Sequence, residues 1–379
     1  MNNKKTYIIW LGFLGIFLAL GVYAAVRLYT QGSDAVFHAD DTIPWTLLIA
    51  SYVFFVLTST GATIVASLSL VFGFNRYDPI VKRSIFIGLI SLVAGFISMG
   101  MELGNPLNMF YYFLSPNFKS PIWWMGAFYM CLLVILSLKF WQIHKRKGTF
   151  KFKKLLSISA LILEIAALTT LGSVFGFIEA RPTYFGEFIQ VYFLFSSIIA
   201  GISAIFFFSL IVYKIKYNGI PKNLNEMYDG LSKIFGAFIG ITLLFSIWRI
   251  LIGLYANRPE FDALNYIIET WHYRIEIFMG LMVPFAIMII PNFRRTFSGK
   301  LIASILVFLG LSIERMNMVM LGQIHPIFPE TTEGLHIISY FPTFWEWAIA
   351  AFSLTIMFFL YTLGEKYLNL DTTEFLTNE

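Results

Sequence analysis

The stretch TWHYRIEIFMGLMVPFAIMIIPNFRR, residues 270–295, shows the pattern that decides the fold, a long apolar run with charged residues near its ends. His272, Arg274 and Glu276 stand near its start, an apolar run follows, and Arg294 and Arg295 close it. An apolar run of about 18 residues or more can cross a bilayer as a helix. Ionisable side chains within such a helix are costly, because insertion scales assign roughly 2.5 to 3.5 kcal/mol to a charge at the bilayer centre. The stretch therefore predicts a spanning helix with functional groups at one end.

The composition of the whole chain agrees with a membrane protein. Of the 379 residues, 58% are hydrophobic and only 13% are charged, against about 25% charged in an average soluble domain. The single cysteine, Cys131, lies within an apolar run. A disulfide framework, a cysteine-ligated iron–sulfur cluster and a CxxCH haem attachment are therefore excluded from this chain.

Apolar stretches long enough to cross a membrane occur about ten times, with short polar joints between them. The expected spans are approximately residues 6–28, 44–73, 84–102, 122–141, 155–178, 188–213, 233–256, 272–290, 301–320 and 343–363. This pattern predicts an all-α integral membrane protein with one polytopic domain over residues 1–379. An even number of spans places both termini on the same side.

The positive-inside rule assigns an orientation to these spans. With the N-terminus inside, the inner joints hold most of the basic residues, including Lys4, Lys5, Arg76, Lys82, Arg83, Lys145, Arg146, Lys147, Lys214, Lys216, Arg294, Arg295 and Lys300. The outer joints hold mainly acidic residues, including Asp34, Asp40, Asp41, Glu260, Asp262, Glu330 and Glu333. Both termini are therefore predicted to be cytoplasmic.

Ionisable residues inside the predicted spans gather in the outer half. They are Glu102, Arg249, His272, Arg274, Glu276, Glu314, Arg315 and Glu346. Each of them alone could be an interfacial side chain or a structural ion pair. The set comes from five different spans at similar depth, however, so mutual pairing can offset much of the desolvation cost. This arrangement favours a shared polar site near the outer face.

Helical geometry separates two neighbours in this set. Arg274 and Glu276 are two residues apart, so their side chains diverge by about 200 degrees and only one of them can face a common site. Glu276 is the deeper of the two and is the preferred site residue. Glu164 stands apart, near the middle of the fifth span, where a carboxyl group is either a structural hydrogen-bonding partner or one stop in a proton path.

Aromatic residues accompany the charges at the outer ends of the spans. Trp45, Trp123, Trp124, Trp248, Trp271 and Trp345 all lie there. An aromatic wall beside a proton-accepting carboxylate suits the flat headgroup of a quinone. Paired histidines at membrane depth, which would hold haem b, are missing from the sequence, because only His272 is near a span.

Several segments resemble the polysulfide reductase membrane-subunit family (NrfD/PsrC-like), and especially its ten-span HybB-type branch. They are PWTLLIASYVFF from Pro44, RYDPIVKRSIFIGLISLVAGFISMGMELGNPLN from Arg76, YRIEIFMGLMVP from Tyr273, ERMNMVMLGQ from Glu314 and SYFPTFWEW from Ser339. Each motif is weak alone, but together they cover most of the chain in the expected order.

The resemblance implies two four-helix bundles with flanking helices in a bacterial inner membrane. It also implies a site for menaquinone or ubiquinone near the outer face, without haem or an iron–sulfur cluster in this chain. The partners it implies are a periplasmic ferredoxin-like iron–sulfur subunit and a periplasmic catalytic subunit. The long joints at residues 103–121 and 322–342 are the expected docking surface for them.

The site residues carried over by the resemblance are Glu102, Glu276, Arg315, Asn317 and Glu346. Glu102 and Glu276 are the expected proton acceptors. Trp45, Arg249, His272, Arg315, Asn317 and Glu346 are expected to line the quinone site, and Glu164 is the residue expected for a proton path. One segment departs from some relatives, because TTLGSVFG offers only Thr169, Thr170 and Ser173 where they have a histidine and a glutamine.

The predicted function is that of the quinone-binding subunit of a respiratory oxidoreductase, oxidising quinol or reducing quinone. Two other classes of function remain open at this point. Ten spans with buried charges would also suit a secondary transporter, although the sequence shows no convincing internal repeat. A membrane anchor for a periplasmic enzyme would bind no quinone at all.

Overall fold

The computed structural model describes residues 4–39, 43–103, 110–146, 149–181, 183–256, 262–324 and 340–371. Within them the chain is helical. The main helices are α1 (Lys4–Gln31), α2 (Leu47–Leu70), α3 (Asp78–Glu102), α4 (Tyr111–Leu114), α5 (Pro121–Lys145), α6 (Phe150–Gly176), α7 (Phe188–Tyr217), α8 (Asn225–Ala256), α9 (Asp262–Glu269), α10 (Trp271–Ile275), α11 (Val283–Ile289), α12 (Pro291–Arg294), α13 (Phe297–Leu321) and α14 (Phe344–Tyr367). A π-helical segment, η6 (Glu276–Met282), joins α10 to α11.

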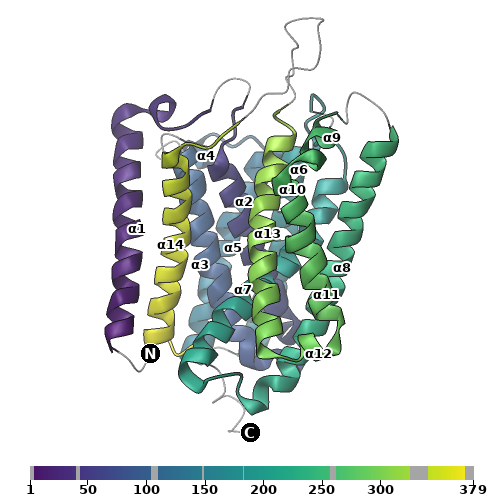
Figure 1. Cartoon of the computed structure of the whole chain (residues 1–379). Helices are drawn as coiled ribbons and strands as arrows, with labels where there is room; N and C mark the ends of the chain where they lie inside the picture. The colour runs from purple at the N-terminus through teal and green to yellow at the C-terminus, as the bar shows by residue number, and fades with distance from the viewer. Residues whose placement is uncertain are drawn as a thin grey trace, which may run out of the picture.

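Ten helical stretches of the described residues are long and apolar enough to cross a membrane, which confirms the predicted number of spans. They stand side by side as one bundle (Figure 1). α2 packs on α3 and α5 on α6, while α7 packs on α8 and α13, and α13 on η6. α1 packs on α14 at the edge of the bundle. The helices thus form two groups of four, with α1 and α14 flanking them.

The two groups meet along α2 and α7, which are the most buried spans. Within their most apolar windows 83% and 72% of the residues are buried, against 17% for α1. Gly61 of α2 faces Gly201 of α7 at this crossing, since a Cβ atom on Gly61 would lie 1.7 Å from the carbonyl oxygen of Ser197. Glycine at both positions lets the backbones touch, as small residues do in membrane helix pairs.

The described chain begins and ends at the same end of the bundle (Figure 1). We call this end the inner end, following the orientation predicted from the basic residues, and the opposite end the outer end. α2, α6, α13 and α14 each begin after a threonine whose hydroxyl accepts a hydrogen bond from the first turn. Such N-caps satisfy amide groups that have no partner within the helix.

The sequence prediction was wrong about where the third span begins. It places Lys82 and Arg83 in an inner joint, but both belong to the first turns of α3, and Arg83 is only 1% exposed. Arg83 is buried at low cost because it pairs with Glu365 at 2.8 Å and with Asp371 at 2.7 Å. Hydropathy assigns such charged residues to a loop. Acidic partners from the distant C-terminal segment allow them to be buried within a helix.

Candidate functional site

Buried and half-buried polar side chains gather at the outer end in two clusters. The Glu276 cluster consists of Glu276, Glu314, Arg315 and Asn317, with Arg249 beside it. The Glu102 cluster consists of Glu102, Glu346, Thr46 and Tyr340, with Trp45 and Gln323 beside it. Apart from His272 and Glu164, the residues predicted from the sequence are therefore brought together, but into two groups.

The π-helical segment positions Glu276. Pro284 at the start of α11 has no amide hydrogen and cannot donate the usual hydrogen bond to the preceding turn. The backbone widens into η6 just before this proline. Gly280 of η6 packs against Gly310 of α13, where an added Cβ atom would lie 2.7 Å from the neighbouring Cα atom. This contact brings the widened turn close to α13, and π-bulges are frequent at functional sites.

The Glu276 carboxylate is buried and has a neutral partner. It is 4% exposed, and its Oε2 atom accepts a hydrogen bond of 2.6 Å from the side-chain amide of Asn317 on α13. No hydrogen bond to its second oxygen is found among the described residues. Arg274 is exposed, as the two-residue spacing predicted. Glu276 therefore turns inward with one oxygen available to a ligand.

Two arginines offset the negative charges in this cluster. Arg315, 1% exposed, forms an ion pair with Glu314 and donates a hydrogen bond of 2.6 Å to Ser196 of α7. Its guanidinium lies 4.9 Å from the ring centre of Phe193. Glu276 interacts electrostatically with Glu314, Arg249 and Arg315. The cluster thus holds two acids and two bases from α8, α13 and η6.

Arg249 of α8 approaches the cluster from the lipid side of the bundle. Its guanidinium lies 5.1 Å from the ring centre of Phe188 and is only half-buried. Several large side chains on the neighbouring part of α8 are exposed, including Trp248, Leu251 and Ile252. The Glu276 cluster is therefore bordered by a helix that faces the hydrocarbon.

Glu102 holds the start of α2. Its Oε1 atom accepts a hydrogen bond of 2.9 Å from the Thr46 amide, and its Oε2 atom accepts one of 2.5 Å from the Thr46 hydroxyl. Thr46 is the N-cap of α2. A carboxylate at a helix N-terminus is stabilised by the unpaired amides and the helix dipole. Glu102 therefore has a structural role at α2 in addition to any role in proton transfer.

Glu346 is completely buried at the start of α14. It accepts a hydrogen bond of 2.8 Å from the His38 amide and another from the Tyr340 hydroxyl, while Tyr340 accepts one of 2.9 Å from the Leu47 amide. Burial, followed by the bond to Glu346, raises the pKa of Tyr340 above its ordinary value, so the phenol stays protonated. Glu346 also interacts electrostatically with Glu102.

Trp45 links the Glu102 cluster to α13. Its amide donates to the side-chain oxygen of Gln323 at 2.9 Å, and the Gln323 amide donates back to the Trp45 carbonyl at 3.1 Å. The Trp45 ring packs edge-on against Phe175 with 5.1 Å between ring centres. Asn317 lies in the last turns of α13, and Gln323 follows two residues after the helix ends at Leu321. The two clusters therefore border the same end of α13.

His272 lies apart from these hydrogen bonds. Its Nδ1 atom is 3.2 Å from the Thr270 hydroxyl, and its ring contacts Trp271. Both partners are local, so the structure does not join His272 to Glu276. His325 and His336, and residues 104–109 and 325–339 of the expected docking joints, lie outside the described residues.

Glu164 is buried near the midpoint of α6, close to a second buried ionisable residue. It is 0% exposed, and neither carboxylate oxygen has a hydrogen-bond partner among the described residues. It interacts electrostatically with Lys139 of α5, whose side chain is 1% exposed. The Lys139 Nζ atom likewise has no hydrogen-bond partner among the described residues, so the two charges are neighbours without a direct hydrogen bond. The sequence does not predict this proximity, because the two residues belong to different helices and no spacing rule connects them.

Other site residues missed from the sequence are Thr46, Tyr340, Gln323 and Ser196. All are uncharged, and their types are common in membrane helices, so nothing in the sequence marks Tyr340, Gln323 or Ser196 as site residues. Thr46 could have been found as an N-cap, since it directly precedes an apolar run. One feature of the sequence could have indicated the π-helical segment, because Pro284 lies in the middle of a predicted span.

Comparisons with known proteins agree with the membrane fold. A family model described as polysulphide reductase, NrfD, matches residues 35–327. A selenate reductase subunit of Mesobacillus selenatarsenatis is 22% identical over 95% of this chain and 93% of its own length. The menaquinone reductase integral membrane subunit of Nitratidesulfovibrio vulgaris is 22% identical over 97% of this chain and 92% of its own length. The Hdr-like menaquinol oxidoreductase integral membrane subunit of Archaeoglobus fulgidus is 22% identical over 92% of this chain and 89% of its own length.

Proposed function

Because the chain belongs to the polysulphide reductase NrfD family, we propose that it is the quinone-binding membrane subunit of a bacterial respiratory oxidoreductase complex. Two of the similar proteins are named for menaquinone or menaquinol chemistry, and a third is part of a selenate reductase. The observation that carries the proposal is the buried Glu276 carboxylate, with one oxygen bonded to Asn317 and two arginines nearby.

The proposed reaction is the exchange of two electrons and two protons with a quinone. When quinol is oxidised, each hydroxyl group gives up one proton and the ring gives up two electrons. Glu276 accepts one proton from a hydroxyl at its unbonded oxygen, and Asn317 orients the carboxylate. Arg249 and Arg315 offset the two carboxylate charges before the transfer, and the cluster is one charge more positive until the proton moves on. The same groups serve the reverse reaction, in which quinone is reduced.

Glu102 and Glu346 are proposed as the second proton-handling group. They lie at the outer end, close enough for their negative charges to repel each other, and have hydroxyl partners in Thr46 and Tyr340. Protons would leave toward the outer side through this cluster. The electrons would pass to a ferredoxin-like iron–sulfur subunit docked on the outer face, and from there to a periplasmic catalytic subunit. The redox centre that receives them is proposed to belong to that partner.

Photolabelling of the purified complex tests quinone binding at this place. A photoreactive menaquinone analogue is expected to label η6 or the end of α13 near Asn317, and excess menaquinone should prevent the labelling. Labelling that does not saturate, or that falls on the lipid-facing side of α1, would contradict the proposal. A membrane anchor without a quinone site would give that result.

Glu164 and Lys139 are proposed to carry protons between the inner end and the outer clusters. Glu164→Gln alone removes an opposite charge near the buried Lys139 ammonium. The expected cost in stability is below the roughly 3 to 5 kcal/mol of a buried ion pair in direct contact, because no hydrogen bond joins these two groups. Replacing both, as Glu164→Gln with Lys139→Met, removes the unpaired charge and is expected to restore stability. The thermal unfolding of the single and double variants checks this expectation.

The double variant separates a proton path from a structural ion pair. Reconstituted into proteoliposomes with its partners, it is expected to keep electron transfer and to lose proton uptake from the inner side. Normal proton uptake in a well-folded double variant would assign the pair to structure alone.

A further inference from the structure

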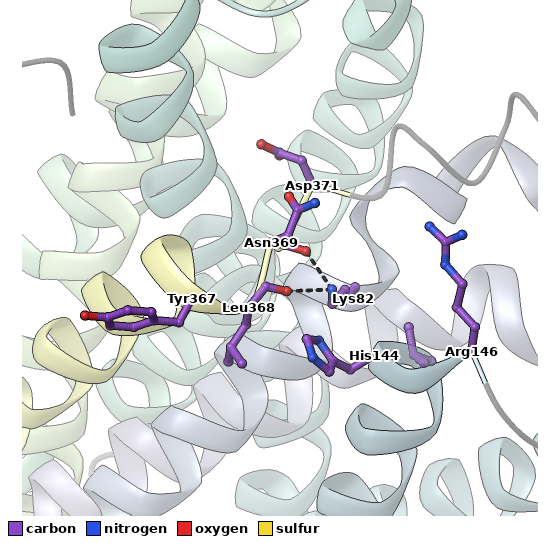
Figure 2. A pocket seen from close by; sticks show the side chains of 8 residues that line it. Lys82, His144, Arg146, Tyr367, Leu368, Asn369 and Asp371 are labelled. Carbon is purple, nitrogen blue, oxygen red and sulfur yellow. Dashed lines mark hydrogen bonds between the residues drawn. The ribbon is translucent and has the colours of Figure 1, made fainter.

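A basic pocket opens at the inner end of the bundle, far from the two outer clusters. Its volume is about 180 Å³, and it lies between α3, α5 and the segment after α14 (Figure 2). Its lining residues are Lys82, Ile143, His144, Arg146, Tyr367, Leu368, Asn369 and Asp371. A single water needs only about 10 to 15 Å³, so the pocket has room for a larger polar group.

The charges around this pocket favour an anion. Lys82, His144 and Arg146 supply cationic or protonatable groups. The one acid, Asp371, is already paired with Arg83 at 2.7 Å and with Lys216 at 3.3 Å. Its negative charge is therefore offset from outside the pocket, and the lining as a whole is positive.

The local structure holds these groups in place. Lys82 donates hydrogen bonds to the carbonyl oxygens of Leu368 at 2.7 Å and Asn369 at 2.6 Å (Figure 2). The His144 ring stacks on Phe140 and lies against the backbone of Leu368, and its Nδ1 atom is buried without a hydrogen-bond partner among the described residues. Arg146 ends α5 in a left-handed conformation, with φ of 53°. The pocket is thus built from fixed elements, and the His144 Nδ1 atom remains to bond a ligand.

We propose that this pocket binds a phosphate group, and that an anionic lipid headgroup supplies it. The pocket lies at the level of the helix ends, where the headgroups of a bilayer lie. Basic pockets between spanning helices on the cytoplasmic side recognise such headgroups. A bound phosphate would join α5 to α3 and to the segment after α14, and so fix the C-terminal segment to the bundle.

The test measures lipid binding to the purified full chain by native mass spectrometry and by thermal unfolding. Delipidated protein is supplied with cardiolipin, phosphatidylglycerol, phosphatidylcholine or inorganic phosphate. The two anionic lipids are expected to bind and to raise the unfolding temperature, while phosphatidylcholine does neither. A rise with inorganic phosphate alone would support the phosphate site and assign it to the free ion. No binding by any of the three anions would overturn the proposal.

Matched variants locate the binding. Arg146→Gln together with His144→Gln should weaken lipid binding about tenfold, since Arg146 supplies a charge-assisted contact and His144 a hydrogen bond. Lys145→Gln makes the same change of charge on the neighbouring residue, which does not line the pocket, and should leave binding unaltered. Equal loss in both variants would show non-specific attraction to the inner surface and would overturn the proposal. Both variants should keep quinol-dependent electron transfer, because the pocket lies away from Glu276.

Discussion

Replacing Glu276 by glutamine is expected to lower quinol-dependent electron transfer about 100-fold or more, because a positioned general base contributes 10² to 10⁴ in rate. Glutamine keeps the shape of the side chain, and its oxygen can still accept the hydrogen bond from Asn317. It cannot accept a proton from quinol at neutral pH. The measurement is steady-state electron transfer from a soluble quinol analogue through the assembled complex, with the amount of each protein in the complex determined in parallel.

Glu269→Gln is the matched control for this experiment. Glu269 is the last residue of α9, lies at the same end of the bundle and is exposed. The same loss of charge there should leave the rate within about twofold, as is usual for surface substitutions. If Glu276→Gln behaved like this control in a fully assembled complex, Glu276 would not be the proton acceptor.

Glu102→Gln gives an informative comparison between the two clusters. A glutamine can still accept from the Thr46 amide while its own amide donates to the Thr46 hydroxyl, so the start of α2 should remain intact. A role in releasing the second proton predicts a loss of about tenfold to 100-fold, without a change in unfolding temperature. An unaltered rate of electron transfer would show that Glu102 has only a structural role, at the start of α2.

The sequence predicted the number of spans well because hydropathy and span length are local properties. It located Glu102, Glu276, Arg315 and Glu346 for a related reason, since a charge inside an apolar run stands out whatever the fold. Which of these residues meet could not be predicted. Glu276 joins Asn317, while Glu102 joins Thr46, and both choices depend on how the helices pack.

Partners distant in the sequence explain the remaining differences. Hydropathy places Arg83 in a joint because its acceptors, Glu365 and Asp371, come from the other end of the chain. Lys139 escapes prediction for the same reason, as its charge is offset by Glu164 on the next helix. A buried charge is tolerated only where tertiary structure supplies the opposite charge, and no local pattern carries that information.

The crossing of α2 and α7 predicts the largest effect on stability. An alanine at Gly61 would place its Cβ atom 1.7 Å from the backbone oxygen of Ser197, and one at Gly201 would place it 2.0 Å from the backbone of Gly61. A change of rotamer cannot relieve a clash between a Cβ atom and a neighbouring backbone, so the two most buried helices must separate. Overpacking at such a site is expected to cost about 3 kcal/mol in the free energy of unfolding.

Thermal unfolding of the purified chain in detergent measures this cost, and Gly12→Ala provides the control. Gly12 lies in α1, where nothing stands within 4 Å of an added Cβ atom. Alanine there should be neutral or should stabilise the chain by up to about 1 kcal/mol, because glycine is a poor helix former. Gly61→Ala and Gly201→Ala should each lower the unfolding temperature. If both variants unfolded like the wild type, α2 and α7 would not be in backbone contact, and the arrangement that brings α13, Arg315 and Glu276 against α7 would be wrong as well.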